Sequence, residues 1–189
     1  MRLGLALMRI VIGGLFVGHG LQKLAGKFGG YGPAGTGQFF ETLGLRPGKT
    51  HALAAGAAET GGGALLAAGA FTPLAGTLLS GTMATAIRTV HAPKGPWNSD
   101  GGFEYNLVLM AAVFAVTDAG PGAWSIDAAR GRARWGAGWA LAQLAAGLAG
   151  SAAGIAYGRS RPAPPEAAPE AAAAPANGAV PAAATTTPA

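Results

Sequence analysis

Five apolar stretches, each nearly free of charged residues, occupy most of this chain and limit the folds that it can adopt. They lie at residues 3–24, 50–70, 73–90, 104–117 and 135–157. About 20 helical residues cross the hydrocarbon core of a bilayer, and all of the stretches except the fourth come close to or exceed that length. The pattern predicts an all-α protein: a transmembrane four-helix bundle, followed by a fifth C-terminal helix.

Composition supports a membrane protein and excludes several other classes. Of the 189 residues, 50% are hydrophobic and only 11% are charged, whereas soluble domains carry about 25% charged residues. The net charge of +5 comes from basic residues scattered over loops and helix ends, so no nucleic-acid partner is expected. The chain has no cysteine, which rules out disulfides, thiolate metal sites and a cysteine nucleophile. Three histidines without acidic neighbours predict no metal site.

The segments between the stretches set the expected topology. Residues 25–37 are rich in glycine and contain Pro33, so we expect a loop there. Residues 38–45 fit either a short helix at the membrane interface or an ordered loop. Only a tight turn at residues 69–72 separates the second stretch from the third, which makes those two helices antiparallel neighbours. Pro73 suits the first turn of the third helix.

These boundaries predict three parts in the chain. Residues 1–128 form the four-helix membrane domain, residues 129–157 a basic linker and the fifth helix, and residues 158–189 a disordered Ala/Pro-rich tail. The first stretch could also be read as a cleaved signal peptide, but Arg9, His19 and Lys23 interrupt it and a small-residue cleavage site is lacking, so an uncleaved helix is favoured.

Loop charges predict the orientation. The cluster Arg130, Arg132 and Arg134 is the densest group of basic residues beside two helices. Cytoplasmic loops carry an excess of Lys and Arg, so we place this cluster and the N-terminus in the cytoplasm. The tail then follows a fifth crossing to the outside.

A few charged residues lie within the apolar stretches, where they are costly and usually mark function. His19 and Lys23 are four residues apart and share a helix face, and Arg9, about four turns earlier, points in a similar direction. Glu59 in the middle of the second stretch is their natural counter-charge, because a lone ionised carboxylate there would be too costly.

A second group lies around the loop that joins the third and fourth stretches. Arg88 and His91 are three residues apart, and Glu104 is the acidic partner across the loop. We expect both groups to converge on a polar pocket near one membrane surface. Snorkelling of Lys23 and Arg88 to the interface is the alternative. No catalytic residue is assigned; the candidates for ligand or proton binding are Arg9, His19, Lys23, Glu59, Arg88, His91, Glu104 and Asn106.

Five motifs in order resemble the DoxX family. They are RIVIGGLFVGHGLQKL (9–24), FETLGLRP (40–47), AETGGGALL (58–66), GGFEYNL (101–107) and GPGAWSID (120–127), and the resemblance covers residues 5–128. It implies a four-helix protein of the bacterial cytoplasmic (inner) membrane with redox-linked work, so the fifth segment and the tail exceed the family pattern.

Three functions stay open at this point. The chain is a membrane subunit or organiser of a quinone- or thiol-linked redox complex, a proton-coupled carrier of small molecules, or a non-catalytic scaffold. In the first case it acts as part of an oxidoreductase only with a soluble or membrane redox enzyme as partner. No intrinsic cofactor is expected, and quinone is the candidate ligand. Its other expected partners are the lipid bilayer and further copies of itself.

Overall fold

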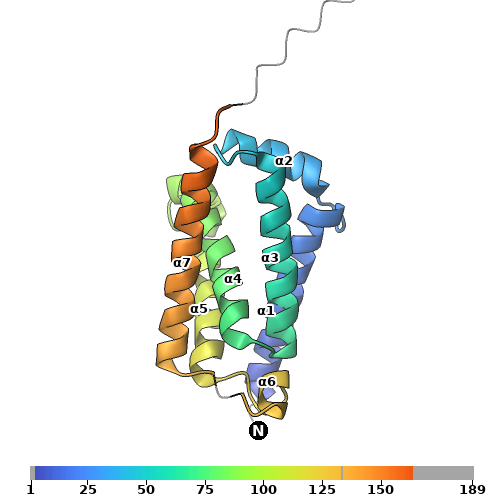
Figure 1. The fold of residues 1–189 in the computed structure, drawn as a ribbon, viewed down its shortest axis with the longest axis vertical. Coiled ribbons are helices and arrows are strands. Elements are labelled where there is room, and N and C mark those ends of the chain that lie inside the picture. The colour runs from blue at the N-terminus through green and yellow to red at the C-terminus, as the bar shows by residue number, and fades with distance from the viewer. Residues whose placement is uncertain (1–2, 133, 164–189) are drawn as a thin grey trace, which may run out of the picture.

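A computed structural model describes residues 3–132 and 134–163 of the chain, and this part contains helices and turns but no strand. The predicted all-α class is confirmed. Five long helices form an up-and-down bundle (Figure 1). They are α1 (Leu3–Ala25), α3 (Gly48–Ala68), α4 (Thr72–Ala86), α5 (Glu104–Ala119) and α7 (Ala137–Arg159).

Short elements close the two ends of the bundle (Figure 1). We call the end that holds the N-terminus the lower end; α6 (Ile126–Ala129) and the α3–α4 turn lie there. The upper end holds α2 (Gly32–Thr42), which lies across the tip of α3. The chain between α4 and α5 forms the π-helical turn η1 (Ile87–His91) and the 3₁₀ turns η2 (Ala92–Lys94) and η3 (Asn98–Asp100).

Glycine brings the antiparallel helices α1 and α3 into backbone contact. A Cβ atom on Gly63 of α3 would lie 2.6 Å from the carbonyl oxygen of Gly13 and 2.9 Å from Cβ of Phe16. Small residues on α4 and α7 likewise let these parallel helices approach, since a Cβ on Gly81 would lie 3.2 Å from the carbonyl oxygen of Gly147. Small residues at helix contacts are typical of membrane bundles.

Large apolar side chains from four helices fill the centre. Phe16 of α1, Leu66 of α3, Leu79 of α4 and Val113 of α5 are almost fully buried in one cluster. The outward faces are apolar as well: α1 exposes Leu7, Ile10, Val11 and Leu15, α5 exposes Leu107 and Val108, and α7 exposes Leu141 and Leu148.

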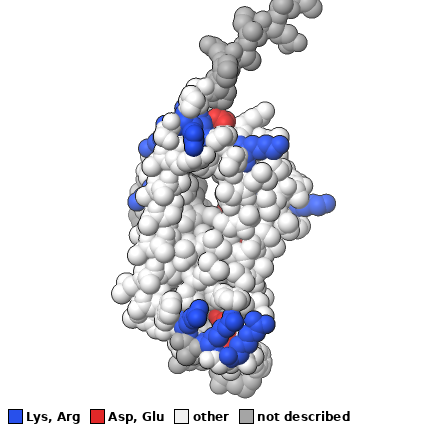
Figure 2. All heavy atoms as spheres, in the orientation of Figure 1, with Lys and Arg blue, Asp and Glu red and all other residues white. Residues whose placement is uncertain are grey.

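Charged side chains gather at the two ends of the molecule. Figure 2 shows Lys, Arg, Asp and Glu at the upper and lower ends of one face, with an almost uncharged band between them. In the described part of the chain, α1 and α7 have the length and hydropathy of membrane-crossing helices. Crossing by the other three long helices stays a prediction.

The structure changes three of the predicted boundaries. Helix α2 begins at Gly32, with Pro33 in its first turn, so the loop expected at residues 25–37 ends earlier; proline is tolerated in the first turn because the N–H there needs no partner. The third predicted helix does not continue regularly to Val90 but widens into η1. The predicted tail keeps its first two residues, 158 and 159, in α7; from residue 164 on it lies outside the described residues.

Candidate functional site

Lys23 and Glu59 form a partly buried ion pair between α1 and α3. The Lys23 Nζ and Glu59 Oε2 atoms are 2.5 Å apart, and the two side chains are 22% and 6% exposed, respectively. Gly56 makes this possible: a Cβ there would lie 3.2 Å from Cβ of Lys23. Because helical side chains tilt toward the N-terminus of their helix, those of Lys23 and Glu59 lean toward one another from antiparallel helices.

Polar groups on α1 continue the pair toward the upper end. The Lys23 ammonium also lies 3.4 Å from the carbonyl oxygen of His19, to which it donates. The Nδ1 atom of His19 is 3.0 Å from Oε1 of Gln22, whose amide donates to the carbonyl of Phe28 in the next loop. Beside Glu59, the Thr60 hydroxyl is buried without a hydrogen-bond partner. The pair is thus the inner end of a polar strip.

The second predicted group orders the loop between α4 and α5. His91 Nδ1 lies 2.7 Å from the carbonyl oxygen of Gly101, and Glu104 accepts a hydrogen bond of 2.7 Å from the backbone N–H of Asn98. Arg88 is exposed. Both Arg88 and His91 lie in the π-helical turn η1, whose winding is wider than that of the α-helix from which their common face was predicted.

Asn106 lies deeper, in the contact between α4 and α5. It is buried, and its amide lies 3.3 Å from the sulfur of Met83. Among the described residues, the hydrogen bonds and ion pairs therefore divide the predicted pocket into a Lys23–Glu59 centre, a loop-ordering group and a packing contact.

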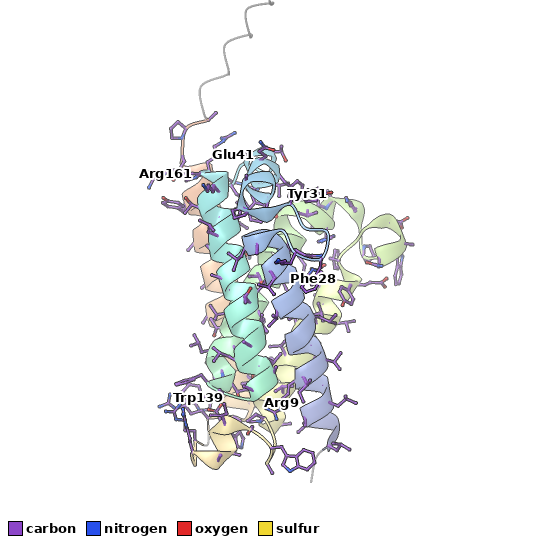
Figure 3. All side chains as sticks on the ribbon, turned by 90° about the vertical axis from the view of Figure 1, so that its right-hand side faces the viewer. Arg9, Phe28, Tyr31, Glu41, Trp139 and Arg161 are labelled. Carbon is purple, nitrogen blue, oxygen red and sulfur yellow. The ribbon has the colours of Figure 1, made fainter. Side chains whose placement is uncertain are left out.

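Arg9 lies at the opposite end of α1, as Figure 3 shows. Its side chain is 2% exposed and donates from Nη2 to the carbonyl oxygen of Trp124, while Nε and Nη1 have no partner. A Cβ on Gly69 would collide with this guanidinium. Arg9 thus holds the 120–125 loop over the lower end. About four turns of α1 separate Arg9 from Lys23, and the two side chains have different partners.

Asp127 and Gln143 are buried polar residues that are not among the candidates predicted from the sequence. Asp127 accepts hydrogen bonds from the backbone N–H groups of Phe71 and Thr72, at 3.0 and 2.9 Å, and from the Thr72 hydroxyl at 2.8 Å. Gln143 of α7 is 2% exposed, and its Nε2 atom has no partner. Gln143 could have been found by the rule that singled out Glu59, since it is a polar residue inside an apolar stretch.

The Lys23–Glu59 centre offers an ammonium group that donates hydrogen bonds and a carboxylate that accepts them. The described residues contain no cluster of three or more His, Cys, Asp or Glu side chains suited to a metal ion. The chain offers no thiol either.

Comparison with known proteins shows to which protein family the chain is related. The DoxX family model matches residues 4–92. The chain is 35% identical over 115 residues to the protein named "Putative oxidoreductase CatD" of Bacillus subtilis (strain 168); the alignment covers 61% of this chain and 79% of that protein. No solved structure matches. On these matches, together with the five motifs and the helical bundle, the chain belongs to the DoxX family of membrane proteins.

Proposed function

We propose that this protein is a multi-pass protein of the bacterial inner membrane that serves as the membrane subunit or organiser of a redox complex. In this proposal the Lys23–Glu59 centre binds the head group of a quinone and exchanges protons with it. The observation that carries the proposal is the ion pair itself, placed between two apolar helices.

The distribution of charged and aromatic side chains on the surface supports a bundle that lies wholly within the membrane. The uncharged band separates two charged ends (Figure 2). Exposed aromatic side chains accompany the charges: Tyr31 and Trp97 lie in the upper segments, and Trp124 and Trp139 in the lower ones. Trp and Tyr prefer the two interfaces of a membrane, so this distribution favours five crossings with both ends at the water boundary.

The energetics of the pair favour a functional role. Two ionised groups lose hydration when they are buried, and their attraction often does no more than offset that loss. Apolar residues would join α1 and α3 at least as well. Ionisable groups inside a membrane are commonly found on ion or proton pathways, and the polar strip through His19 and Gln22 links this pair to the upper end.

The proposed redox role rests on the name of the relative and on the chemical groups that Lys23 and Glu59 offer. The relative is named an oxidoreductase, and the chain has no cysteine of its own. A bound quinol supplies two electrons and two protons when it is oxidised. In this chain Lys23 offers a hydrogen-bond donor to a quinone oxygen, and Glu59 offers a carboxylate that accepts a proton.

The test combines native purification with two substitutions. Full-length tagged protein is isolated from native membranes in mild detergent, and its proteins and extracted lipids are identified by mass spectrometry. We expect a redox enzyme or quinone in stoichiometric amount, and quinol-dependent activity that Lys23→Met and Glu59→Gln each abolish. Lys27→Met is the control, because Lys27 is exposed and lies on the same side of the bundle.

The opposite result would be equally informative. Unchanged quinol-dependent activity in both variants would remove the pair from the reaction. A lone oligomer without quinone or enzyme would favour the scaffold, and uptake of a solute by proteoliposomes would favour the carrier.

A further inference from the structure

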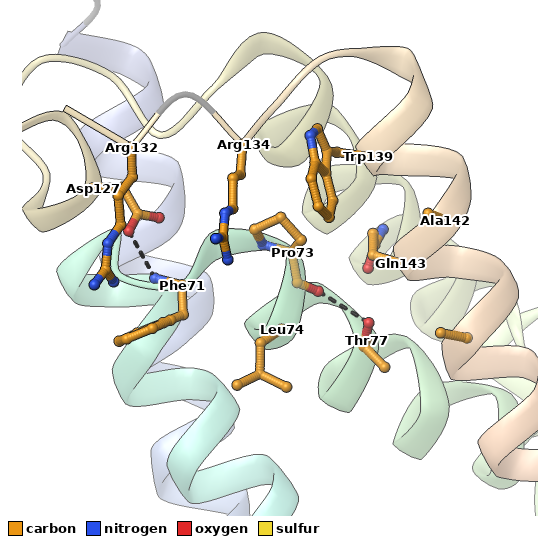
Figure 4. Close-up of a pocket in the computed structure, with 11 residues that line it drawn as sticks. Phe71, Pro73, Leu74, Thr77, Asp127, Arg132, Arg134, Trp139, Ala142 and Gln143 are labelled. Carbon is orange, nitrogen blue, oxygen red and sulfur yellow. Dashed lines mark hydrogen bonds between the residues drawn. The ribbon is translucent and has the colours of Figure 1, made fainter. Parts of the chain in front are cut away.

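A groove opens at the lower end between α4 and α7, away from the Lys23–Glu59 centre. Its volume is about 310 Å³. Figure 4 shows its two kinds of wall: apolar and small side chains of the helices on one side, and two arginines from the segment before α7 on the other. The walls include Pro73, Leu74 and Thr77 from α4, and Trp139, Ala142 and Ala146 from α7.

Arg132 and Arg134 give the mouth of the groove a concentrated positive charge. Arg132 stacks over the ring of Phe71, with its guanidinium carbon 4.5 Å from the ring centre, and Arg134 lies 6.0 Å from the Trp139 ring centre. The Nη1 atom of Arg132 is buried without a hydrogen-bond partner. The two ion pairs found among the described residues, Lys23–Glu59 and Arg46–Glu41, involve neither arginine.

The acidic residue of the groove does not neutralise this charge by direct pairing. Asp127 uses both carboxylate oxygens to accept the N–H groups of Phe71 and Thr72 at the start of α4, as well as the Thr72 hydroxyl. Its hydrogen bonds thus go to the α4 terminus, which leaves the donors of the two guanidinium groups available to an anion.

A buried donor farther in points to a second contact. Gln143 lines the groove and is 2% exposed, yet its Nε2 atom has no acceptor. Its Oε1 atom receives only a long hydrogen bond of 3.4 Å from Ser80. In a membrane, an unmet donor of this kind is costly, so an acceptor that enters the groove at this depth would be stabilised.

We infer that this groove binds an anionic glycerophospholipid of the leaflet at the lower end. The phosphate lies between Arg132 and Arg134, an ester carbonyl accepts a hydrogen bond from Gln143, and an acyl chain follows the small and apolar side chains Leu74, Ala142 and Ala146. Basic pockets between membrane helices recognise lipid head groups in this way. Helix α7 lies beyond residues 4–92 of the family match, so the groove is an addition to the matched part of the bundle.

The test measures lipid binding by the full-length protein in detergent micelles. The probes are phosphatidylglycerol and phosphatidylcholine with brominated acyl chains, which quench tryptophan fluorescence on contact, here Trp139 in a variant whose other tryptophans are phenylalanine. We expect phosphatidylglycerol to bind about tenfold more tightly than phosphatidylcholine, and the double substitution Arg132→Gln/Arg134→Gln to abolish that preference.

Two further variants separate a lipid site from general charge effects and misfolding. Arg159→Gln/Arg161→Gln removes two charges from the other end of α7 and should leave the preference intact. Ala146→Phe fills the acyl part of the groove, where Ala146 is exposed, keeps both arginines, and should weaken phosphatidylglycerol binding. Size-exclusion profiles and thermal unfolding show that each variant is folded.

Three results would overturn the inference. Equal binding of the two lipids by the parent protein would show that the arginines do not select an anion. Equal loss of preference in Arg159→Gln/Arg161→Gln would assign the effect to net charge. Competition by inorganic phosphate as strong as that by phosphatidylglycerol, with no effect of Ala146→Phe, would show an ion site without a lipid chain.

Discussion

Glu59 keeps one ionic partner on a helix face that is otherwise small and apolar, so the pair should be sensitive to which member is removed. Lys23→Met leaves the nearly inaccessible carboxylate without its counter-ion, and the expected loss in free energy of unfolding is about 3 kcal/mol. Glu59→Gln leaves Lys23, whose side chain is more exposed and can turn toward the surface, so the loss should be smaller. Chemical or thermal unfolding in detergent measures both.

The double variant and a nearby lysine give the controls for this comparison. Lys23→Met/Glu59→Gln removes both charges and should recover part of the stability lost in Lys23→Met, because no isolated charge remains. Lys27→Met should be neutral. Strictly additive losses in the double variant would mean that the two side chains do not stabilise one another.

Asp127 should stabilise the start of α4 although it is distant in the chain. Two of its three hydrogen bonds satisfy N–H groups that have no partner within the helix, and the third comes from the Thr72 hydroxyl. Asp127→Ala should lower the free energy of unfolding by about 1–2 kcal/mol, the usual loss for a helix cap. Asp127→Asn keeps one acceptor oxygen and should lose less. If both variants have the same free energy of unfolding as the parent protein, the cap adds nothing to stability.

Sequence reasoning at this scale worked where one physical rule was decisive. A buried charge needs a partner, and that rule predicted a basic partner for Glu59 on the first helix, which the structure gives as Lys23; the role of the two residues in binding stays a prediction. The partner of Arg9 is a backbone carbonyl, that of Trp124. Every residue carries such a group, so no side-chain pattern could identify it.

Among the elements, the α1–α3 contact depends most on glycine. A Cβ on Gly63 would meet the backbone of α1, whereas one on Gly61, two residues earlier in α3, would meet nothing within 4 Å. Gly63→Ala should therefore force the helices apart and lower stability by roughly 1–3 kcal/mol. Gly61→Ala, the matched control, should be neutral or slightly stabilising. Equal unfolding temperatures of the two variants would contradict the close packing of α1 on α3.

Helix existence could be predicted better than helix detail. The long apolar stretches gave α1, α3, α5 and α7 with bounds within about two residues, because hydropathy and breaker residues determine both ends. Pro33 was read as a breaker, although it stands in the first turn of α2, where proline is accepted. The widening of α4 into η1 was not predicted, because the apolar stretch continues through it without a change in pattern.

At the scale of the whole molecule, the two charged ends and the direction of α7 determine what each surface can meet. With the five crossings that we propose, the lower end, with Arg132 and Arg134, lies on the opposite side of the membrane from the end of α7. The cluster of Arg130, Arg132 and Arg134 is the densest group of basic residues beside two helices and favours the cytoplasmic side for the lower end, where anionic lipid head groups also attract basic segments. The topology therefore links the proposed inner-membrane role to the proposed lipid groove.

The absence of cysteine makes this topology directly testable, because each introduced thiol is the only one in the chain. Ser99 and Ser160 are exposed at the upper end, and Ala129 is exposed at the lower end. In sealed vesicles of known orientation, a membrane-impermeant maleimide should label Ala129→Cys from the cytoplasmic side, and Ser99→Cys and Ser160→Cys from the opposite side. Labelling of Ser160→Cys from the same side as Ala129→Cys would show that α7 does not cross the membrane. The groove beside Arg132 and Arg134 would then not lie where a membrane lipid can enter it.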